Sequence, residues 1–381
     1  MEVSIAARHT VARVDLSALQ ANYRTIRALT IDAARQSRRT APEIIGVVKA
    51  NAYGHGAVRV GRALEAAGAS MLACADIDEG IELRCGGVRV PVLIFGALGI
   101  SDLDGLFTHR LIPTISTPTA ARNLQQAAEA RGELLHCQLK IDTGMNRLGF
   151  RHDNLRRTLP AIAESRNLAI DAVYTHFATA DDPESEAFAC QRERFEAARR
   201  LLAALGLHPS DAHAANSAAL LRDERVWYDA LRPGLLLYGV VPPPLATTLE
   251  IVPVLSLTSR IVAVKGLRPD EGVGYGLRYQ ADRPTTLAVV PAGYADGLDR
   301  RLAGRAWVLV RGRRAPIVGA VSMDMLTVDV TGLEVSPGDE VVILGRQERE
   351  RIDVREMAAA IGTIPYELLC RLGSRIDRVY D

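Results

Sequence analysis

Lysine is scarce in this chain of 381 residues, and its scarcity points to the first candidate for chemistry. Of the 46 basic residues, only Lys49, Lys140 and Lys265 are lysines, and the rest are arginines. Lys49 ends an apolar run that is expected to be a buried strand, and the glycine-rich residues 50–56 follow it. A partly desolvated lysine in such a place has a lowered pKa and can form a Schiff base. The alternative is a structural lysine whose amine reaches solvent from a strand end.

Further polar residues follow two later predicted strands. Lys140 and Arg147 flank the segment KIDTGMNR, and an arginine in such a glycine-flanked loop could bind a carboxylate through two parallel hydrogen bonds. It could equally be a solvated surface charge. His176 ends the next strand, where a histidine is either a proton carrier or a hydrogen-bonded core residue.

Two more strand ends have the features of a phosphate site. Asn216 and Ser217 open a helix after the seventh predicted strand. Gly234 follows Arg232 after the eighth, where backbone N–H groups could come close to a ligand. The loops after strands seven and eight are the usual phosphate site of a (β/α)8 barrel. Ordinary helix capping by Ser217 is the alternative.

The elements that must position these residues alternate between β-rich and helical runs from residue 43 to 238. Helical patterns lie between the strands, most clearly at 191–205, and a first helix is expected at 17–29. Eight such strands predict a (β/α)8 barrel, with a doubly wound sheet as the main alternative. The expected strands are 44–49, 71–75, 92–96, 111–116, 134–142, 169–176, 211–214 and 228–232.

A proline cluster at 242–244 ends this alternation and predicts a division into domains at 1–241 and 242–381. Beyond it, short strand patterns separated by Gly and Asp turns predict a mainly antiparallel β-domain. Residues about 10–15 also have a strand pattern, which could pair with either domain. Tyr275 lies in a glycine-rich turn of the second domain. The expected strands there are 254–264, 285–291, 307–310, 315–321, 326–330 and 340–344.

Composition excludes several classes of function. The 46 basic and 45 acidic residues nearly cancel, which argues against nucleic-acid and membrane-surface partners. The longest apolar run, near 90–100, is too short to span a membrane, and the first ten residues lack a secretion-signal pattern. The five cysteines are scattered without a CxxC pair. They favour reduced, mostly buried thiols in the cytoplasm over a disulfide framework or a metal site.

A series of segments, taken together, closely resembles the bacterial alanine racemases, which use pyridoxal 5′-phosphate (PLP). These segments occur in the family's order and cover nearly the whole chain. The resemblance implies a PLP-binding (β/α)8 barrel followed by a β-domain, and a homodimer whose active site is built across the subunit interface. The segments are VVKANAYGHG (47–56), KIDTGMNRLG (140–149), YTHFATAD (174–181), AANSAA (214–219), LRPG (231–234), GVGYG (272–276), AGYADG (292–297), VSMDM (321–325) and IPYE (364–367).

The resemblance also implies a role for each matching residue. Lys49 corresponds to the lysine that holds PLP covalently and acts on the α-proton of the D-substrate. Tyr275 corresponds to the tyrosine, contributed by the other subunit, that acts on the opposite face. Lys140 corresponds to a lysine that is carbamylated in many members and orients Arg147. The other matches are Tyr53, Ser217, Gly234, Leu235 and Tyr366 at the phosphate with Asn216 beside it, Arg232 at the pyridine nitrogen, His176 between Arg232 and the tyrosine, Arg147 near the phenolic oxygen and substrate carboxylate, and the backbone of Met323 from the other subunit at that carboxylate.

The implied chemistry explains why these residue types are needed. Racemisation removes the α-proton from one face and returns a proton to the other, so two bases on opposite faces serve it better than one. Lysine and tyrosine both have reference pKa values of about 10, and each must be tuned downward. Arg232 cannot protonate the pyridine nitrogen, so the carbanion is less delocalised and transamination is disfavoured. The implied activity interconverts L-alanine and D-alanine and supplies D-alanine for peptidoglycan.

Three other readings remain open. The chain could racemise another amino acid or a broader range of them, because pockets discriminate weakly between side chains that differ by a methylene or hydroxyl. It could be a fold-related PLP decarboxylase, although those enzymes place an acidic residue at the pyridine nitrogen, where this chain has Arg232. A non-catalytic PLP carrier would resemble the barrel alone, and the second domain with Tyr275 argues against it.

Overall fold

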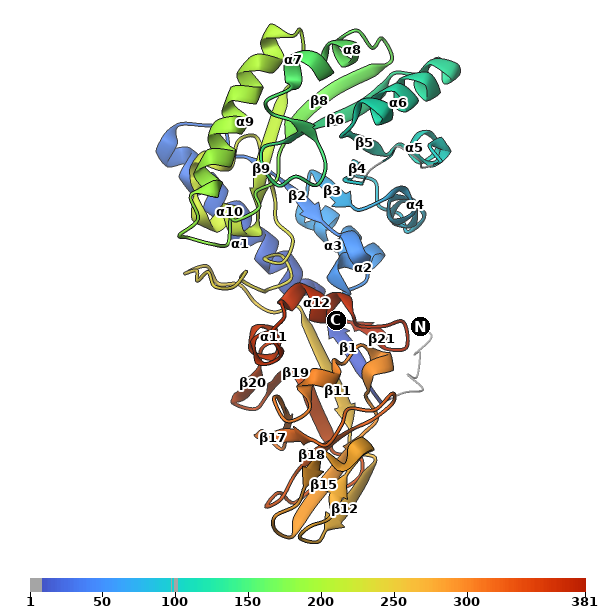
Figure 1. Ribbon diagram of the computed structural model, residues 1–381, viewed down its shortest axis with the longest axis vertical. Coiled ribbons are helices and arrows are strands. Elements are labelled where there is room, and N and C mark those ends of the chain that lie inside the picture. Colours follow the sequence, from blue (N-terminus) through green and yellow to red (C-terminus); the bar gives the residue numbers. More distant parts are fainter. Residues whose placement is uncertain (1–8, 97, 99–101) are drawn as a thin grey trace.

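The computed structural model describes residues 9–96, 98 and 102–381. They form two lobes stacked along the long axis of the molecule, a barrel and a β-domain, with α11 (Val354–Ile361) and α12 (Pro365–Cys370) between them (Figure 1). Part of the region examined for a secretion signal (1–8) and part of the apolar run near 90–100 (97, 99 and 100) lie outside the described residues.

Eight parallel strands form a closed barrel, as the sequence predicted. Each strand pairs with its neighbour, and the pairing of β5 with β6 closes the sheet, which excludes a doubly wound sheet. A short strand, β7 (Phe150–Arg151), extends β6. The barrel strands are β2 (Glu43–Val47), β3 (Met71–Cys74), β4 (Val92–Ile94), β5 (Ile112–Ile115), β6 (Leu135–Asp142), β8 (Leu168–Tyr174), β9 (Asp211–Asn216) and β10 (Ala230–Arg232).

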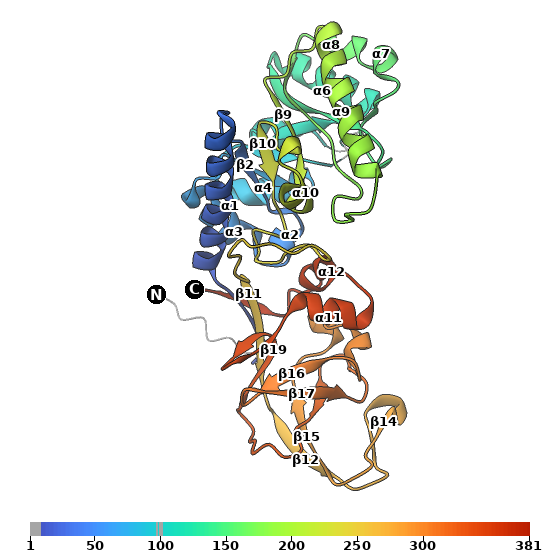
Figure 2. The same cartoon turned by 90° about the vertical axis from the view of Figure 1, so that its left-hand side faces the viewer.

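Helices surround the barrel strands, and their ends carry ordinary capping signals (Figures 1 and 2). Helix α6 (Pro118–Arg131), for example, is capped at its N-terminus by Thr117, whose side chain accepts a hydrogen bond from Ala120 N–H, and at its C-terminus by Gly132 in the left-handed conformation. The helices are α1 (Leu16–Ser37), α2 (Lys49–Tyr53), α3 (Ala57–Ala67), α4 (Ile77–Cys85), α5 (Asp104–Thr108), α6 (Pro118–Arg131), α7 (Leu155–Thr158), α8 (Pro160–Ala163), α9 (Ala187–Ala204) and α10 (Ser217–Arg222), with a 3-10 turn η1 (Glu224–Val226).

The β-domain is a mainly antiparallel sheet, in the order β12-β15-β18-β17-β16-β19-β11-β1-β21, with β20 paired to β19. A separate hairpin joins β13 to β14. The elements are β1 (Val11–Val14), β11 (Leu255–Arg260), β12 (Ala263–Leu267), β13 (Gly272–Val273), β14 (Tyr279–Gln280), β15 (Thr285–Val290), β16 (Trp307–Val310), β17 (Arg313–Val318), β18 (Leu326–Asp329), β19 (Glu340–Gln347), β20 (Glu350–Ile352) and β21 (Asp377–Tyr380), with 3-10 turns η2 (Tyr275–Leu277), η3 (Tyr294–Asp296) and η4 (Arg300–Leu302).

One predicted strand of the β-domain is two strands. The run 254–264 was expected to be continuous, but β11 ends before Ile261 and β12 begins after Val262. Ile261 N–H donates to Asp339 O, on the β19 side, whereas Val262 N–H donates to Val289 O of β15. The backbone therefore changes partner strands between these two residues, which an apolar pattern does not reveal.

Strand β1 belongs to the sheet of the β-domain. It pairs antiparallel with β11 and parallel with β21, and α1 then leads directly into the barrel. Two connections therefore link the lobes, one at Asp15 and one at residues 233–254. In the first, Asp15 N–H donates to Val254 O, so the two connections touch each other.

The structure also bears on the predictions about membrane spans and cysteines. No helix in the described part of the chain is long and apolar enough to cross a membrane. All five cysteines are free. Cys74 and Cys137 are buried, but Cys85, Cys190 and Cys370 are exposed, so the expectation of mostly buried thiols is wrong. The three exposed thiols are on helices α4, α9 and α12, whereas the buried pair are on barrel strands.

Candidate active site

A cavity of about 650 Å³ lies at the carboxyl ends of the barrel strands, on the side that faces α12. It is lined by every site residue predicted from the sequence except Tyr275 and Met323. Active sites of (β/α)8 barrels lie at this end. The predicted residues that line it are Lys49, Tyr53, Lys140, Arg147, His176, Asn216, Ser217, Arg232, Gly234, Leu235 and Tyr366.

The sequence predicted that Lys49 ends a strand, but it does not. Strand β2 stops at Val47, and Lys49 opens a tight turn in which residues 50 to 53 all have φ of 52–53°. This left-handed helical conformation costs roughly 1–2 kcal/mol for each residue other than glycine. Such strain persists only where surrounding structure holds it, and it gathers at functional sites. Burial and nearby Arg147 lower the pKa of the Lys49 amine.

Ser217 and Gly234 form a polar cradle at the ends of β9 and β10. The Ser217 hydroxyl oxygen accepts hydrogen bonds from Gly234 N–H (2.9 Å) and Leu236 N–H (3.2 Å). A side chain at position 234 would lie 2.3 Å from the Tyr53 hydroxyl, so only glycine fits there. Asn216, and not Ser217, caps α10, since its side chain accepts from Ala219 N–H at 2.9 Å. The Ser217 O–H therefore stays available to a ligand.

Tyr53 and Tyr366 bring two phenol groups to the same cradle. Their ring centroids are 5.9 Å apart, and Tyr53 also packs on Tyr238 at 4.9 Å. Tyr366 lies in the first turn of α12, so this part of the cavity wall comes from the second lobe. Burial raises the pKa of Tyr366 to about 12. Both phenols are therefore protonated hydrogen-bond donors near neutral pH.

Lys140 is a buried amine among cations. Only 6% of it is exposed, and within the described residues it has no ion pair with an acid. Asp142, the partner considered from the sequence, instead accepts from Gly144 N–H and Asn146 N–H, both at 3.0 Å. Burial, followed by the charge of Arg147, lowers the pKa of Lys140 to about 8.

Arg232 is the centre of a buried network. It donates to Thr175 O (2.7 Å), Ala214 O (2.8 Å) and His213 Nδ1 (2.6 Å), and Nη2 lies 3.4 Å from His176 Nδ1. Burial lowers the pKa of Arg232 to about 10. This value is still well above 7, so Arg232 remains charged at neutral pH. His213, which starts the HAANSAA segment, was not among the site residues predicted from the sequence.

Gln191 on α9 joins two loops of the site, and it was also missed. Its amide donates to Thr143 Oγ1 (3.1 Å) and His176 O (3.0 Å) and accepts from Ala178 N–H (2.8 Å). The loop that carries Arg147 and the loop that carries His176 are thus fixed to one buried side chain. Its position inside a predicted helix gave no sign of this contact.

Tyr275 and Met323 lie on the β-domain, apart from the cavity of their own chain. Tyr275 is 77% exposed in η2 beside β14, which lies at the far end of the molecule from α2 (Figure 2). Met323 is 52% exposed, and Ala295 N–H donates to its carbonyl, which places it beside Tyr294. Leu277, Tyr294 and Met325 are exposed as well. One end of the β-domain thus carries several uncovered apolar side chains.

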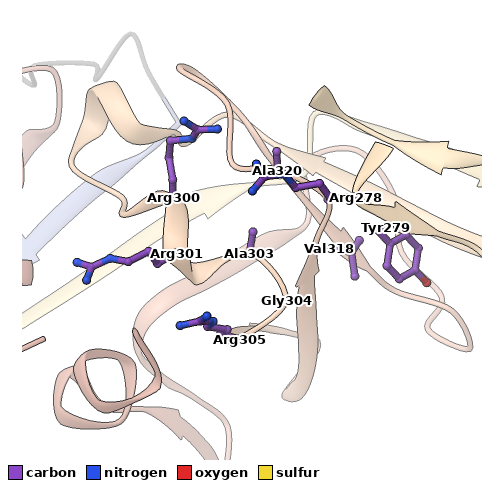
Figure 3. A pocket seen from close by; sticks show the side chains of 10 residues that line it. Arg278, Tyr279, Arg300, Arg301, Ala303, Gly304, Arg305, Val318 and Ala320 are labelled. Atoms are coloured by element: carbon purple, nitrogen blue, oxygen red, sulfur yellow. The ribbon is translucent and has the colours of Figure 1, made fainter. Parts of the chain in front are cut away.

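A second cavity, of about 450 Å³, lies close to these loops (Figure 3), and it shares no lining residue with the first cavity. Arginines from η4 and its following turn, together with Arg278, line it. Arg301 pairs with Asp299 at 2.7 Å, but Arg278, Arg300 and Arg305 have no ion pair within the described residues. The described lining of the cavity therefore holds four arginines and no acidic residue.

Comparison with known proteins agrees with the fold. Residues 14–242 match the model of the alanine racemase N-terminal domain, and residues 254–380 match that of the alanine racemase C-terminal domain. The chain is 41% identical over 375 residues to the alanine racemase of Carboxydothermus hydrogenoformans (97% of this chain, 98% of the relative). It is 38% identical over 375 residues to that of Symbiobacterium thermophilum (98% and 97%).

A solved structure gives the same result. The crystal structure of alanine racemase from D-cycloserine-producing Streptomyces lavendulae superposes with a TM-score of 0.93 at 34% identity, covering 98% of this chain and 97% of that one. The two family models span both lobes and all of the described lining of the cavity except Pro243. The chain therefore belongs to the alanine racemase family, whose members are amino-acid isomerases.

Proposed function

We propose that the barrel cavity binds PLP and interconverts L-alanine and D-alanine. The observation that carries the proposal is the meeting of Lys49, Arg232 and the Ser217–Gly234 cradle in one cavity. An amine, a fixed cation and a hydroxyl beside backbone N–H groups are what the aldehyde, pyridine ring and phosphate of PLP require. Family membership supports alanine as the substrate.

The residues of the cavity fit the charge and shape of the cofactor. Lys49, Lys140, Arg147 and Arg232 line it, whereas Asp181 is the only acid in the described lining. A phosphate and a substrate carboxylate would balance this excess of positive charge. The phosphate would take the Ser217 O–H and the phenols of Tyr53 and Tyr366, beside Asn216, Gly234 and Leu235. When bound, PLP supplies the ring that delocalises the carbanion formed at Cα.

We assign the two proton transfers to Lys49 and to Tyr275 of a second copy. The Lys49 amine takes the α-proton of D-alanine or returns it, and its lowered pKa makes the neutral amine more available. The Tyr275 phenol does the same at the opposite face. His176, which would stand between that phenol and Arg232, is neutral because burial and the charge of Arg232 lower its pKa.

The need for a second copy follows from where Tyr275 lies. Its ring and the side chain of Met323 are exposed on a β-domain end that does not reach the cavity of the same chain. Within the described residues, no acceptor pairs with Met323 N–H, which leaves it available to a substrate carboxylate. A homodimer in which each β-domain covers its partner's cavity would bury the apolar side chains and complete the site.

We further propose that Lys140 is carbamylated. Among the described residues its buried amine has no acidic partner, and a pKa of about 8 leaves a reactive neutral fraction at physiological pH. Carbamylation replaces a cation that Arg147 and Arg232 repel with an anion that can hold Arg147 by charge-assisted hydrogen bonds. Arg147 would then be oriented toward the substrate carboxylate.

The experiment that tests the activity is exchange of the α-proton. Incubation with L-alanine in D₂O should incorporate deuterium at Cα with loss of optical rotation, whereas release of CO₂ would indicate a decarboxylase and no change a PLP carrier. Lys49→Ala should abolish both exchange and racemisation. Tyr275→Phe should slow exchange from L-alanine more than from D-alanine. Equal exchange from both enantiomers in that variant would contradict the two-base assignment. A panel of amino acids tests whether the range is broader than alanine.

We infer a division into a PLP-binding barrel (1–241) and a β-domain (242–381), and a cytoplasmic role in supplying D-alanine for peptidoglycan. The segment 242–253 between the lobes has little regular structure, which supports the boundary. Limited proteolysis should cut first within it.

Deleting the gene tests the proposed cellular role. Growth should then depend on added D-alanine if no other racemase is present, and growth without D-alanine in such a strain would contradict this role.

A further inference from the structure

Glu79, on a different helix from Lys49, holds the backbone on which Lys49 stands. Its carboxylate accepts from Ala50 N–H at 2.6 Å through Oε1 and from Ala75 N–H at 2.7 Å through Oε2. Ala50 is the first residue of the left-handed turn and directly follows Lys49. Ala75 follows the end of strand β3. One side chain thus ties the lysine turn to the neighbouring barrel strand.

The position of Glu79 is itself fixed. The side chain of Asp76 caps α4 by accepting from Glu79 N–H at 2.9 Å, so the first turn of α4 is anchored at the end of β3. Asp76, Glu79 and Ala75 therefore form a rigid unit on the barrel rim. Both oxygens of the Glu79 carboxylate are used, which leaves it no freedom to turn away.

The turn needs such support because its conformation is unfavourable. Ala50, Asn51, Ala52 and Tyr53 all have positive φ, and none of them is glycine. Within the described residues, the Ala50 N–H has the Glu79 carboxylate as its acceptor. At the far end of the turn, Arg378 of β21 donates from Nε to Gly54 O at 3.0 Å. The turn is thus held at both ends, by α4 and by the β-domain.

We propose that Glu79 is a positioning residue for Lys49, which keeps the left-handed turn in place and so directs the lysine amine at the reacting carbon. This inference rests on the proposed function, in which Lys49 transfers the α-proton of the D-enantiomer. Without the carboxylate, the turn would relax and the amine would be misplaced. A misplacement of about 1 Å can slow a reaction roughly 10²-fold. The transfer at the opposite face, assigned to Tyr275, does not depend on this turn.

The test compares Glu79→Gln and Glu79→Ala with Asp78→Asn. The glutamine keeps the size of the side chain but has only one acceptor oxygen for two N–H groups. Asp78 is the preceding residue of α4, is exposed, and its side chain has no hydrogen bond within the described residues, so Asp78→Asn makes the same charge change without the contact. Circular dichroism and thermal unfolding establish that the variants fold. If Glu79→Ala does not fold, Glu79→Gln carries the test.

The first measurement is the deuterium isotope effect on kcat/KM in each direction. Glu79→Gln should lower kcat/KM by about 10- to 100-fold, and it should raise the isotope effect for D-[2-²H]alanine without raising that for L-[2-²H]alanine. Asp78→Asn should match the parent. A general loss of structure would not discriminate between the two enantiomers. Isotope effects in Glu79→Gln that stay at the parent values, or rise equally in both directions, would overturn the inference.

The second measurement does not depend on turnover. Acetic anhydride at a series of pH values labels free amines of the full-length apoprotein, and mass spectrometry reads Lys49 against exposed Lys265 as internal standard. The negative charge of Glu79 favours the protonated amine. Labelling of Lys49 should therefore begin at lower pH in Glu79→Gln, and an unchanged profile counts against the inference. If Lys49→Ala still exchanges the α-proton, the proposed function is wrong; if only Glu79→Gln behaves like the parent, the function stands and this inference fails.

Discussion

Arg232 donates a hydrogen bond from Nη1 to Nδ1 of His213 over 2.6 Å, and this contact fixes the tautomer of the histidine. A guanidinium has no acceptor, so Nδ1 carries no proton. His213 Nε2 then carries the proton and donates to Gln138 Oε1 at 2.8 Å. Burial and the charge of Arg232 lower the pKa of His213 well below its usual value, which keeps the ring neutral.

Removing this acceptor should destabilise the protein. His213→Leu leaves a buried Arg232 N–H without a partner, which costs about 1–3 kcal/mol. The midpoint of urea unfolding should fall accordingly. His213→Asn offers a smaller side chain with an acceptor oxygen and should lose less. Equal midpoints for His213→Leu and the parent would show that the contact adds nothing to stability.

Reversing the charge at the pyridine position should change which reaction follows deprotonation. In Arg232→Glu, a carboxylate would favour protonation of the pyridine nitrogen, make the ring a stronger electron sink and lengthen the life of the carbanion. The ratio of pyruvate formed to alanine racemised should therefore increase, and a coupled pyruvate assay measures it. The variant should also be less stable, because Thr175 O and Ala214 O lose their donor. An unchanged ratio would remove the proposed role of Arg232.

Carbamylation of Lys140 predicts a dependence on CO₂. Lys140→Ala should lower kcat/KM, whereas Lys265→Ala, at an exposed position of β12, should not. Activity lost in CO₂-free buffer should return when CO₂ is supplied and, at a fixed concentration of dissolved CO₂, faster as the pH rises from 7 toward 9. The reason is that a pKa of about 8 leaves most of the amine protonated, and unreactive toward CO₂, at the lower pH. If Lys140→Ala keeps the parent kcat/KM, the carbamate has no catalytic role.

A site shared between two copies can be tested by mixing inactive variants. Lys49→Ala and Tyr275→Phe homodimers each have two defective sites. In the mixed dimer, one site carries both defects and the other carries neither. Random reassortment makes about half of the dimers mixed, so activity should recover to about a quarter of the parent value. Recovery that stays at the sum of the two separate variants would place Tyr275 in the site of its own chain.

His55 predicts how stability depends on acid. It is fully buried, its Nδ1 faces Ala52 O and Tyr53 O, and Nε2 has no hydrogen-bond partner in the part of the chain that the structure describes. Burial lowers its pKa to about 4, below the unfolded value of about 6.5. Between these values the unfolded chain binds a proton that the folded chain does not, so stability is full above pH 6.5 and falls as the pH drops toward 4. His55→Phe should flatten this dependence by about 1 kcal/mol per pH unit, measured by urea unfolding at pH 4.5 and 6.5.

The eight barrel strands could be predicted because each is an apolar, β-rich run set between helical patterns. The roles at the site came from matching segments, since a lone arginine or histidine in a strand loop has several readings. The left-handed turn after Lys49 could not be predicted. A glycine in the sequence can signal a backbone with positive φ, but the alanines, asparagine and tyrosine of this turn gave no such signal.

Contacts between residues distant in sequence account for the other misses. Glu79 is the kind of residue expected in the first turn of any helix, where the helix dipole stabilises acidic side chains. Nothing local reveals that its side chain reaches Ala50, 29 residues earlier. Gln191 likewise looks like an ordinary helical residue in the sequence, because only the closed barrel places Thr143 next to it.

The pairing of β1 with β11 and β21 also sets an order of events during synthesis. The ribosome releases β1 first, but β11 follows only about 240 residues later. At about 5–20 residues per second, that interval is roughly 10–50 s. The barrel can therefore close while β1, which belongs to the β-domain, is still unpaired. The sheet of the β-domain cannot be completed until residues 377–380 have emerged from the ribosome. The last strand of the nascent chain, β21, then pairs with the first, β1.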